Sequence, residues 1–201
     1  MKKVLKDKLK KKVQKIFRIY PCNIFVINGM NEFKIVEPKV KCGFIPITLD
    51  NCHRVSDFRE EARIAEYRDK LARNEIGYFA EHNGKMIGSI WATINRTEVP
   101  RVVQTFQKVM YNEGVAHDIV ISENFRGMRV GPFIESNLFA LLFKEYGLSR
   151  VITDVNMRNH AQMQLLTKLG LRVDHKMLYV SLLGRPVLEV SCKKYAKGCS
   201  P

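Results

Sequence analysis

The residues best suited to chemistry lie in one short loop, ENFRGMRVGPF, where an apolar run gives way to a helical pattern. The loop contains two arginines and two glycines, Arg126, Gly127, Arg129 and Gly131. A strand that passes through such a loop into a helix presents backbone N–H groups at the positive end of the helix dipole, an arrangement that binds phosphate. The arginines add charge, and the glycines let a ligand approach the backbone. These residues predict a phosphate site; a plain turn with solvated arginines is the alternative.

The common nucleotide loops do not fit, because the chain has neither GxxxxGK[ST] nor GxGxxG followed by an acidic residue in a βαβ unit. The run from Ile121 to Gly131 instead resembles the acetyl-CoA loop of the GNAT superfamily of N-acyltransferases, whose signature is Arg or Gln, two residues, Gly, one residue, then Gly or Ala. Asn159, Leu165 and the run Lys168 to Leu171 resemble that family's second motif, an asparagine, a helix and a closing Leu-Gly-aromatic. The two motifs stand in the family's order, and the resemblance covers roughly residues 44 to 193.

The resemblance implies an α/β (α+β) fold, with a GNAT-like mixed, mostly antiparallel central sheet, flanking helices and a splayed parallel strand pair. Backbone amides of the loop would cradle the CoA pyrophosphate, and the pantetheine arm would run beside the strand Val115 to Ile121. The thioester would sit where that strand splays from Arg150 to Val155. An amine would attack it directly while a backbone N–H stabilises the oxyanion.

The resemblance also assigns residues to this site. Acetyl-CoA, the acyl donor, would be bound by Ile119, Ile121, Arg126, Gly127, Met128, Arg129, Val130, Gly131 and Asn159. Asp118 or His117, on the strand before the loop, is placed to act as the base that deprotonates the amine. Strand alternation puts these two on opposite faces, so only one would point at the site. A structural hydrogen bond or simple exposure is the alternative for each.

Two positions depart from the family pattern. Arg129 stands where the signature has its first glycine, and it would be strained if that position requires a positive φ. Leu166 stands where many members have a tyrosine that protonates the departing thiolate. A thiol with a pKa of about 8.5 leaves tolerably as thiolate, so activity need not be lost, but no general acid is carried over.

The elements that would position these residues follow from hydrophobic spacing and turn residues. Asn83-Gly84 is typical of a tight hairpin turn between two strands, whereas the spacing from Thr97 to Glu113 is ambiguous, although partly helix-like. The patterns predict strands at Ile45 to Leu49, Gly77 to His82, Lys85 to Asn95, Val115 to Ile121, Arg150 to Val155, Leu171 to Leu182 and Pro186 to Cys192, and helices at Val55 to Asn74, Pro132 to Tyr146 and His160 to Leu169.

The first 18 residues carry nine basic side chains against one acidic one, and so hold more than half of the net charge of +14. A general nucleic-acid binder would spread its charge over the body of the protein. Apolar residues recur at helical spacing from Val4 to Tyr20, which predicts a basic amphipathic helix over residues 1–20, ended by Pro21. This helix would lie on an anionic membrane surface, or pack on the domain or on a partner chain.

The length of 201 residues favours one domain with appendages. We expect the N-terminal helix at 1–20, an extended linker or small hairpin at 21–43, the GNAT-like domain at 44–195 and a C-terminal tail at 196–201. The five cysteines are odd in number and match no metal-ligand spacing with the histidines, which favours a reducing compartment and no metal. With no long apolar run and no signal-peptide cleavage pattern, we expect a cytoplasmic protein, with peripheral attachment to the inner membrane face left open.

The leading interpretation is an N-acyltransferase that moves an acetyl or other acyl group from CoA to a primary amine, such as an amino sugar or a lipid-linked intermediate of envelope polysaccharide assembly. One alternative is an N-acyl amino acid synthase that uses acyl carrier protein, whose acidic surface would suit a basic enzyme. Another is a non-catalytic GNAT-fold protein that binds membrane or nucleic acid. The expected partners are therefore acyl-CoA and a small amine, with acyl carrier protein and a homodimer left open.

Overall fold

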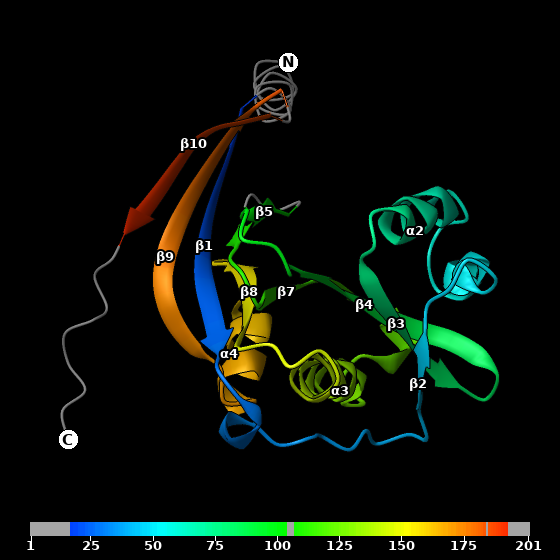
Figure 1. Cartoon of the computed structure of the whole chain (residues 1–201). Helices are drawn as coiled ribbons and strands as arrows, with labels where there is room; N and C mark the ends of the chain where they lie inside the picture. Colours follow the sequence, from blue (N-terminus) through cyan, green and yellow to red (C-terminus); the bar gives the residue numbers. More distant parts are fainter. Residues whose placement is uncertain (1–16, 104–106, 184, 193–201) are drawn as a thin grey trace, which may run out of the picture.

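A computed structural model describes residues 17–103, 107–183 and 185–192 as an α/β domain (Figure 1). Its helices are α2 (Arg63–Ala72), α3 (Val130–Lys144) and α4 (His160–Lys168), with 3₁₀ turns at Met30–Glu32, Cys52–Asp57 and Glu123–Phe125. Its strands are β1 (Phe17–Ile27), β2 (Gly43–Pro46), β3 (Ile76–His82), β4 (Lys85–Ile94), β5 (Arg101–Val102), β6 (Lys108–Val109), β7 (Glu113–Ile121), β8 (Arg150–Asn156), β9 (Arg172–Leu182) and β10 (Arg185–Cys192).

Eight strands form one sheet in the order β10-β9-β1-β8-β7-β4-β3-β2, and β5 pairs separately with β6. Neighbours in the large sheet are antiparallel, with the exception of β7 and β8, which are parallel. The predicted fold class, a mostly antiparallel mixed sheet with one parallel pair, is therefore confirmed.

Helices cover both faces of the sheet. Ile134, Leu138 and Leu142 of α3 are fully buried in the main hydrophobic core. Tyr67 of α2 packs edge-to-face on Trp91 of β4 at 5.1 Å between ring centroids, within a second core on the other face. Figure 1 shows α2 and α3 on opposite sides of the sheet. The strand β7 thus lies between two helical layers, and each layer can contribute side chains to a site on it.

Local signals in the sequence located most of these elements. Asn83 and Gly84 have φ values of 50° and 79°, the left-handed pair that a tight primed hairpin requires between β3 and β4. The helices predicted at Pro132 to Tyr146 and at His160 to Leu169 correspond to α3 and α4. The long helix predicted at Val55 to Asn74 is instead a 3₁₀ turn followed by the shorter α2.

The N-terminal elements differ from the prediction. Phe17 to Tyr20 begin β1 and are not helical, and Pro21 lies within this strand. The helical pattern at residues 4–16 and the tail at 196–201 lie outside the described residues. β1 pairs with β8 on one side and β9 on the other, so the sheet includes residues that the sequence analysis assigned to a linker. Ile24 to Ile27 are all buried, as expected for a strand covered on both faces, whose continuous apolar run carries no alternation.

The ambiguous segment between β4 and β7 contains the short strands β5 and β6 and, among its described residues, no helix. Val109 of β6 is fully buried in a cluster with residues of β1, so contacts far apart in the sequence hold this segment in place. No helix in the described part of the chain has the length and hydropathy needed to cross a membrane.

Candidate functional site

The parallel strands β7 and β8 pair over only three residues each and then separate. The paired residues are Glu113 to Val115 on β7 and Arg150 to Ile152 on β8. β7 continues to Ile121 and β8 to Asn156, and a cavity of about 300 Å³ lies between their diverging ends. We call this cavity the slot; it is lined by Ile90, Ala116, His117, Asp118, Ile119, Glu135, Thr153, Asp154, Val155, Asn156, Asn159 and Gln162.

A β-bulge shapes β7 at the slot. The pairing partner of β4 Ser89 is Val120, but that of Trp91 is His117, so Asp118 and Ile119 both oppose one residue. Asp118 has a φ of 47°, in the left-handed region. The bulge breaks the alternation of side chains, and His117 and Asp118 both contact groups of α2 or the residues that follow it. The expectation that these two residues face opposite sides of the sheet was therefore wrong.

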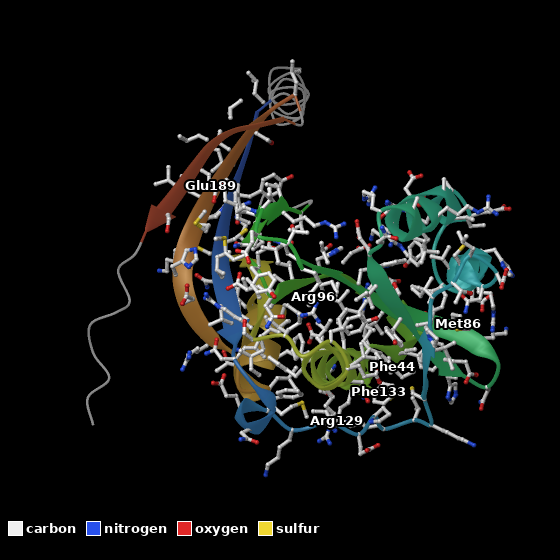
Figure 2. The ribbon with its side chains drawn as sticks, viewed as in Figure 1. Phe44, Met86, Arg96, Arg129, Phe133 and Glu189 are labelled. Atoms are coloured by element: carbon white, nitrogen blue, oxygen red, sulfur yellow. The ribbon has the colours of Figure 1, made fainter. Side chains whose placement is uncertain are left out.

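The loop between β7 and α3 has the backbone of an anion cradle. Gly127 and Arg129 have φ values of 79° and 59°. Among the hydrogen bonds of the described residues, none uses the N–H groups of Gly127, Arg129 or Gly131. Successive N–H groups at the start of a helix attract anions. Phe133 of the first turn of α3 packs against Phe44 at 6.3 Å between ring centroids and so anchors this end of the helix (Figure 2).

A second cavity, of about 570 Å³, lies beside this loop. It is lined by Ile119, Val120, Ile121, Phe125, Arg126, Gly127, Arg129, Val130, Gly131, Pro132, Asn159, Ala161, Gln162 and Leu165. The structure thus brings together all the predicted cofactor residues except Met128, which is 38% exposed and whose carbonyl accepts a hydrogen bond from the N–H of Lys39. Ile119, Asn159 and Gln162 line both cavities, so the loop and the slot adjoin.

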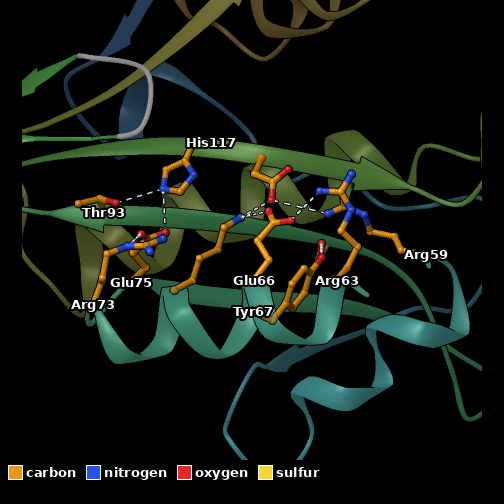
Figure 3. Close-up of polar contacts among 11 residues, drawn as sticks. Arg59, Arg63, Glu66, Tyr67, Arg73, Glu75, Thr93 and His117 are labelled. Atoms are coloured by element: carbon orange, nitrogen blue, oxygen red, sulfur yellow. Dashed lines mark hydrogen bonds and ion pairs between the residues drawn. The ribbon is translucent and has the colours of Figure 1, made fainter. Parts of the chain in front are cut away.

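Asp118 is held by cations from the α2 side of the sheet. Its Oδ2 accepts a hydrogen bond from Lys70 Nζ and lies 3.8 Å from Arg59 Nη1. Lys70 is fully buried, with its ammonium 5.0 Å from the ring of Trp91 and 3.5 Å from Glu66 Oε1. Figure 3 shows this network between α2 and β7. Because a buried ammonium without a counter-charge is costly, the carboxylate of Asp118 has a structural role as a partner of Lys70.

His117 is a buried, neutral imidazole. Its side chain is 5% exposed, and Nε2 lies 3.1 Å from Thr93 Oγ1 and 3.5 Å from Glu75 Oε2 (Figure 3). Burial lowers the pKa of His117 to about 3, and nearby positive charges, first that of Lys70, act in the same direction. The imidazole is therefore uncharged at pH 7, and its contact with Glu75 does not join two full charges.

The sequence analysis did not identify Glu135 or Gln162, which both line the slot. Glu135 of α3 is 3% exposed, and its Oε1 accepts a hydrogen bond of 2.5 Å from Gln162 Nε2 of α4. A signal existed: Glu135 is one helical turn before Phe139 on the apolar stripe of α3, and a carboxyl group at such a position is unusual. Asn159 caps α4, because its Oδ1 accepts from the N–H of Gln162.

The position expected to hold a catalytic tyrosine is closed to the site. Leu166 is fully buried in the main core with other side chains of α3 and the sheet. The neighbouring Leu165 lines the larger cavity instead. Neither side chain can donate a proton.

The comparisons with known proteins agree on the fold. A family model described as "Acetyltransferase (GNAT) family" matches residues 47–171. No curated protein matches the chain significantly. A tandem GNAT protein from the clavulanic acid biosynthesis pathway, solved without acetyl-CoA, is similar with a TM-score of 0.57 at 14% identity, over 83% of this chain and 54% of that one.

Two further structures are similar. A GCN5-related glucosamine N-acetyltransferase region in a fungal multi-domain β-N-acetylglucosaminidase has a TM-score of 0.57 at 13% identity, over 84% of this chain and 22% of that one. AAC(6')-Iy, bound to a bisubstrate analogue of CoA and acetylneamine, has a TM-score of 0.51 at 14% identity, over 65% of this chain and 90% of that one. The chain thus spans little more than half of the tandem protein. Because the family match covers more than half of its 201 residues, the chain belongs to the GNAT acetyltransferase family.

Proposed function

We propose that this protein transfers an acetyl group from acetyl-CoA to the primary amine of a small acceptor. The observation that carries the proposal is that the loop cavity and the slot share Ile119, Asn159 and Gln162. A donor whose phosphates lie at the loop can therefore extend its thioester into the space between β7 and β8.

The loop would bind the pyrophosphate of CoA. The N–H groups of Gly127, Arg129 and Gly131 have no hydrogen-bond partner among the described residues, and an anion would supply one. Arg126 is exposed and lies 3.2 Å from Glu123, which is still more exposed, so its guanidinium can turn to a phosphate at little cost. Arg129 adds a second charge at the start of α3.

The chemistry is direct attack of a neutral amine nitrogen on the thioester carbonyl. The C–N bond forms, the carbonyl becomes an oxyanion, and its collapse expels the CoA thiolate while the nitrogen loses its proton. The bulge at Asp118 removes backbone groups from the β4–β7 ladder, and an N–H freed there can stabilise the oxyanion. Leu166, at the position of the family's tyrosine, cannot donate a proton, so the thiolate would take its proton from solvent.

Asp118 and His117 remain our candidates for the base. Both line the slot, where Asp154 is a second carboxylate that favours the approach of a protonated amine. The carboxylate of Asp118 is already paired with Lys70, and burial disfavours the protonated form of His117. If Asp118 is the base, Asp118→Asn lowers kcat and removes the acidic limb of the pH profile of kcat/KM. An unchanged profile would mean that solvent, and not Asp118, accepts the proton of the amine.

We propose amino sugars as the first acceptors to screen. The support is chemical: the polar lining of the slot suits a cationic amine, and two of the similar structures carry amino-sugar ligands or substrates in their names. A lipid-linked amine at the inner membrane face is the second class, because the lysine-rich first 18 residues would favour an anionic surface. For this second class of acceptor we propose a cytoplasmic location with peripheral attachment to the inner membrane face.

The deciding experiment is isothermal titration of the purified chain with acetyl-CoA. The test variant is the double substitution Arg126→Ala, Arg129→Ala, and the control is Lys85→Ala, Lys144→Ala, which removes two exposed charges away from both cavities. We expect saturable binding that weakens about tenfold or more in the test variant only, since each arginine supplies a charge-assisted contact.

Equal binding by both double variants would contradict the loop site. Absence of heat from the unsubstituted chain would overturn the short-acyl proposal, and acyl carrier protein or a non-catalytic role would then have to be tested. Release of free thiol with an amino sugar, but not with its N-acetylated form, would identify the acceptor class.

A further inference from the structure

Glu135 is a buried acid that the proposed reaction does not yet use. It occupies the second turn of α3, where its neighbours on the apolar stripe, Leu138 and Phe139, are fully buried. Its Oε1 accepts from Gln162 Nε2, while its Oε2 is buried without a hydrogen-bond partner. The side chain lines the slot. An unpaired buried carboxyl oxygen is costly, so its presence beside a ligand cavity requires an explanation.

The environment keeps this carboxyl group protonated at neutral pH. Burial raises the pKa of Glu135 to about 8, and the hydrogen bond from Gln162 only partly offsets this. Among the described residues no cation lies within ion-pair distance of it. The charged or titratable groups that line the slot opposite it are His117, which is neutral, Asp118, which is paired with Lys70, and Asp154.

The hydrogen bond from Gln162 also decides where the proton sits. Because Oε1 is already an acceptor, the proton of the neutral acid is on Oε2. The O–H bond therefore belongs to the oxygen that has no partner. A hydrogen-bond donor fixed in this way at the wall of the slot fits a carbonyl oxygen.

We propose that Glu135 acts as a neutral carboxylic acid that donates a hydrogen bond from Oε2 to an amide carbonyl of the pantetheine arm, and so positions the acyl donor between β7 and β8. The inference rests on the proposed function, because it needs CoA in the slot. Gln162 lies where the two cavities adjoin. It orients Glu135 by its hydrogen bond, and it also lines the cavity beside the phosphate loop. Glu135 is a positioning residue in this proposal, since it does not touch the reacting atoms.

The test compares two ligands that differ only in the arm. CoA is titrated beside 3′-phospho-ADP, which keeps the adenosine and phosphates of CoA and lacks pantetheine, against the unsubstituted chain, Glu135→Leu and Glu135→Gln. Glu145 is an exposed glutamate at the end of the same helix, and Glu145→Leu is the matched control for a glutamate-to-leucine change away from the slot. We expect Glu135→Leu to weaken CoA about 3- to 10-fold, as the loss of one hydrogen bond does, and to leave 3′-phospho-ADP within about twofold.

The conservative variant and the unfolding midpoint separate positioning from a purely structural role. Glu135→Gln keeps a donor at the same place and should bind CoA within about twofold of the unsubstituted chain. Glu135→Leu should not lower the urea midpoint of the free protein, because it removes an unsatisfied buried group at nearly constant volume. If the pair served only to join α3 to α4, Glu135→Leu would lower the midpoint and weaken both ligands equally, which would overturn the inference.

The pH dependence supplies a second readout. The protonated acid is the donor, so affinity for acetyl-CoA should be full below about pH 8 and fall as pH rises through that value in the unsubstituted chain. Glu135→Gln should show only the pH dependence of 3′-phospho-ADP, and an identical decline in that variant would overturn the inference. If the unsubstituted chain binds neither ligand, the proposed function itself fails; if it binds both equally tightly, the loop site stands and the positioning role of Glu135 does not.

Discussion

Replacing Arg129 with glycine should stabilise the free protein, although it removes a side chain. Arg129 immediately precedes α3 with φ 59° and ψ 19°, in the left-handed region that glycine adopts without strain. Its side chain is exposed and makes no hydrogen bond or ion pair among the described residues. The substitution therefore removes backbone strain and almost no packing.

The expected gain follows from two opposing terms. A left-handed conformation costs a non-glycine residue roughly 1–2 kcal/mol, while the greater freedom of glycine in the unfolded chain costs about 0.5–1 kcal/mol. The net stabilisation is about 0.5–1 kcal/mol. For a domain of this size that corresponds to an increase in Tm of about 1–4 °C.

Arg126→Gly is the matched control for this assay. Arg126 is also exposed and lies in the same loop, but its φ of −64° and ψ of 141° are ordinary extended backbone. The same chemical change there relieves no strain, so it should destabilise by about 0.5–1 kcal/mol. Calorimetry and urea unfolding of both variants without ligand measure the difference. Shifts in the same direction for the two variants would refute the assignment of strain to Arg129.

Three further outcomes are expected. Lys70→Met should lower the free energy of unfolding by about 2–3 kcal/mol in urea, because Asp118 loses its buried partner; an additive Lys70→Met, Asp118→Asn double variant would contradict the pairing. Between about pH 6.5 and 3 the free energy of unfolding should fall as pH falls, because an unfolded histidine takes up a proton that folded His117 excludes. In His117→Asn the decrease over this range should be smaller by a few kcal/mol. An unchanged slope in that variant would contradict the low pKa of His117. The full chain should float with anionic vesicles in low salt, and replacing the lysines of residues 2–15 by glutamine should abolish this; equal flotation of that variant would exclude the basic segment as the membrane contact.

Most of the secondary structure could be predicted because its signals are local. The hairpin at Asn83-Gly84 depends on two residues that tolerate positive φ. The core-facing stripe of α3 is visible as a helical repeat. β1 could not be recognised in the same way, since its first residues continue a basic amphipathic pattern and its strand conformation comes from pairing with β8 and β9 far along the chain.

The candidate site, too, could be predicted from the sequence only in part. The order of residues around Arg126 and Asn159 predicted a phosphate loop and a second motif, and the structure places both on one cavity. The sequence could not predict the directions in which the side chains of His117 and Asp118 point, because a single β-bulge breaks the expected alternation. The sequence also could not show that Asp118 pairs with Lys70, a partner 48 residues away that no local pattern identifies.

The sequence by itself determined most of the elements, the residue types of the loop and the family resemblance, because turns, helical repeats and short motifs depend on neighbouring residues. Only the tertiary structure decided what those residues face. It separated β7 from β8 after three pairs, put Arg129 in a left-handed conformation and placed Glu135 at the wall of the slot. Burial and charge depend on groups that meet only after folding, so the protonation states of His117 and Glu135 are properties of the fold.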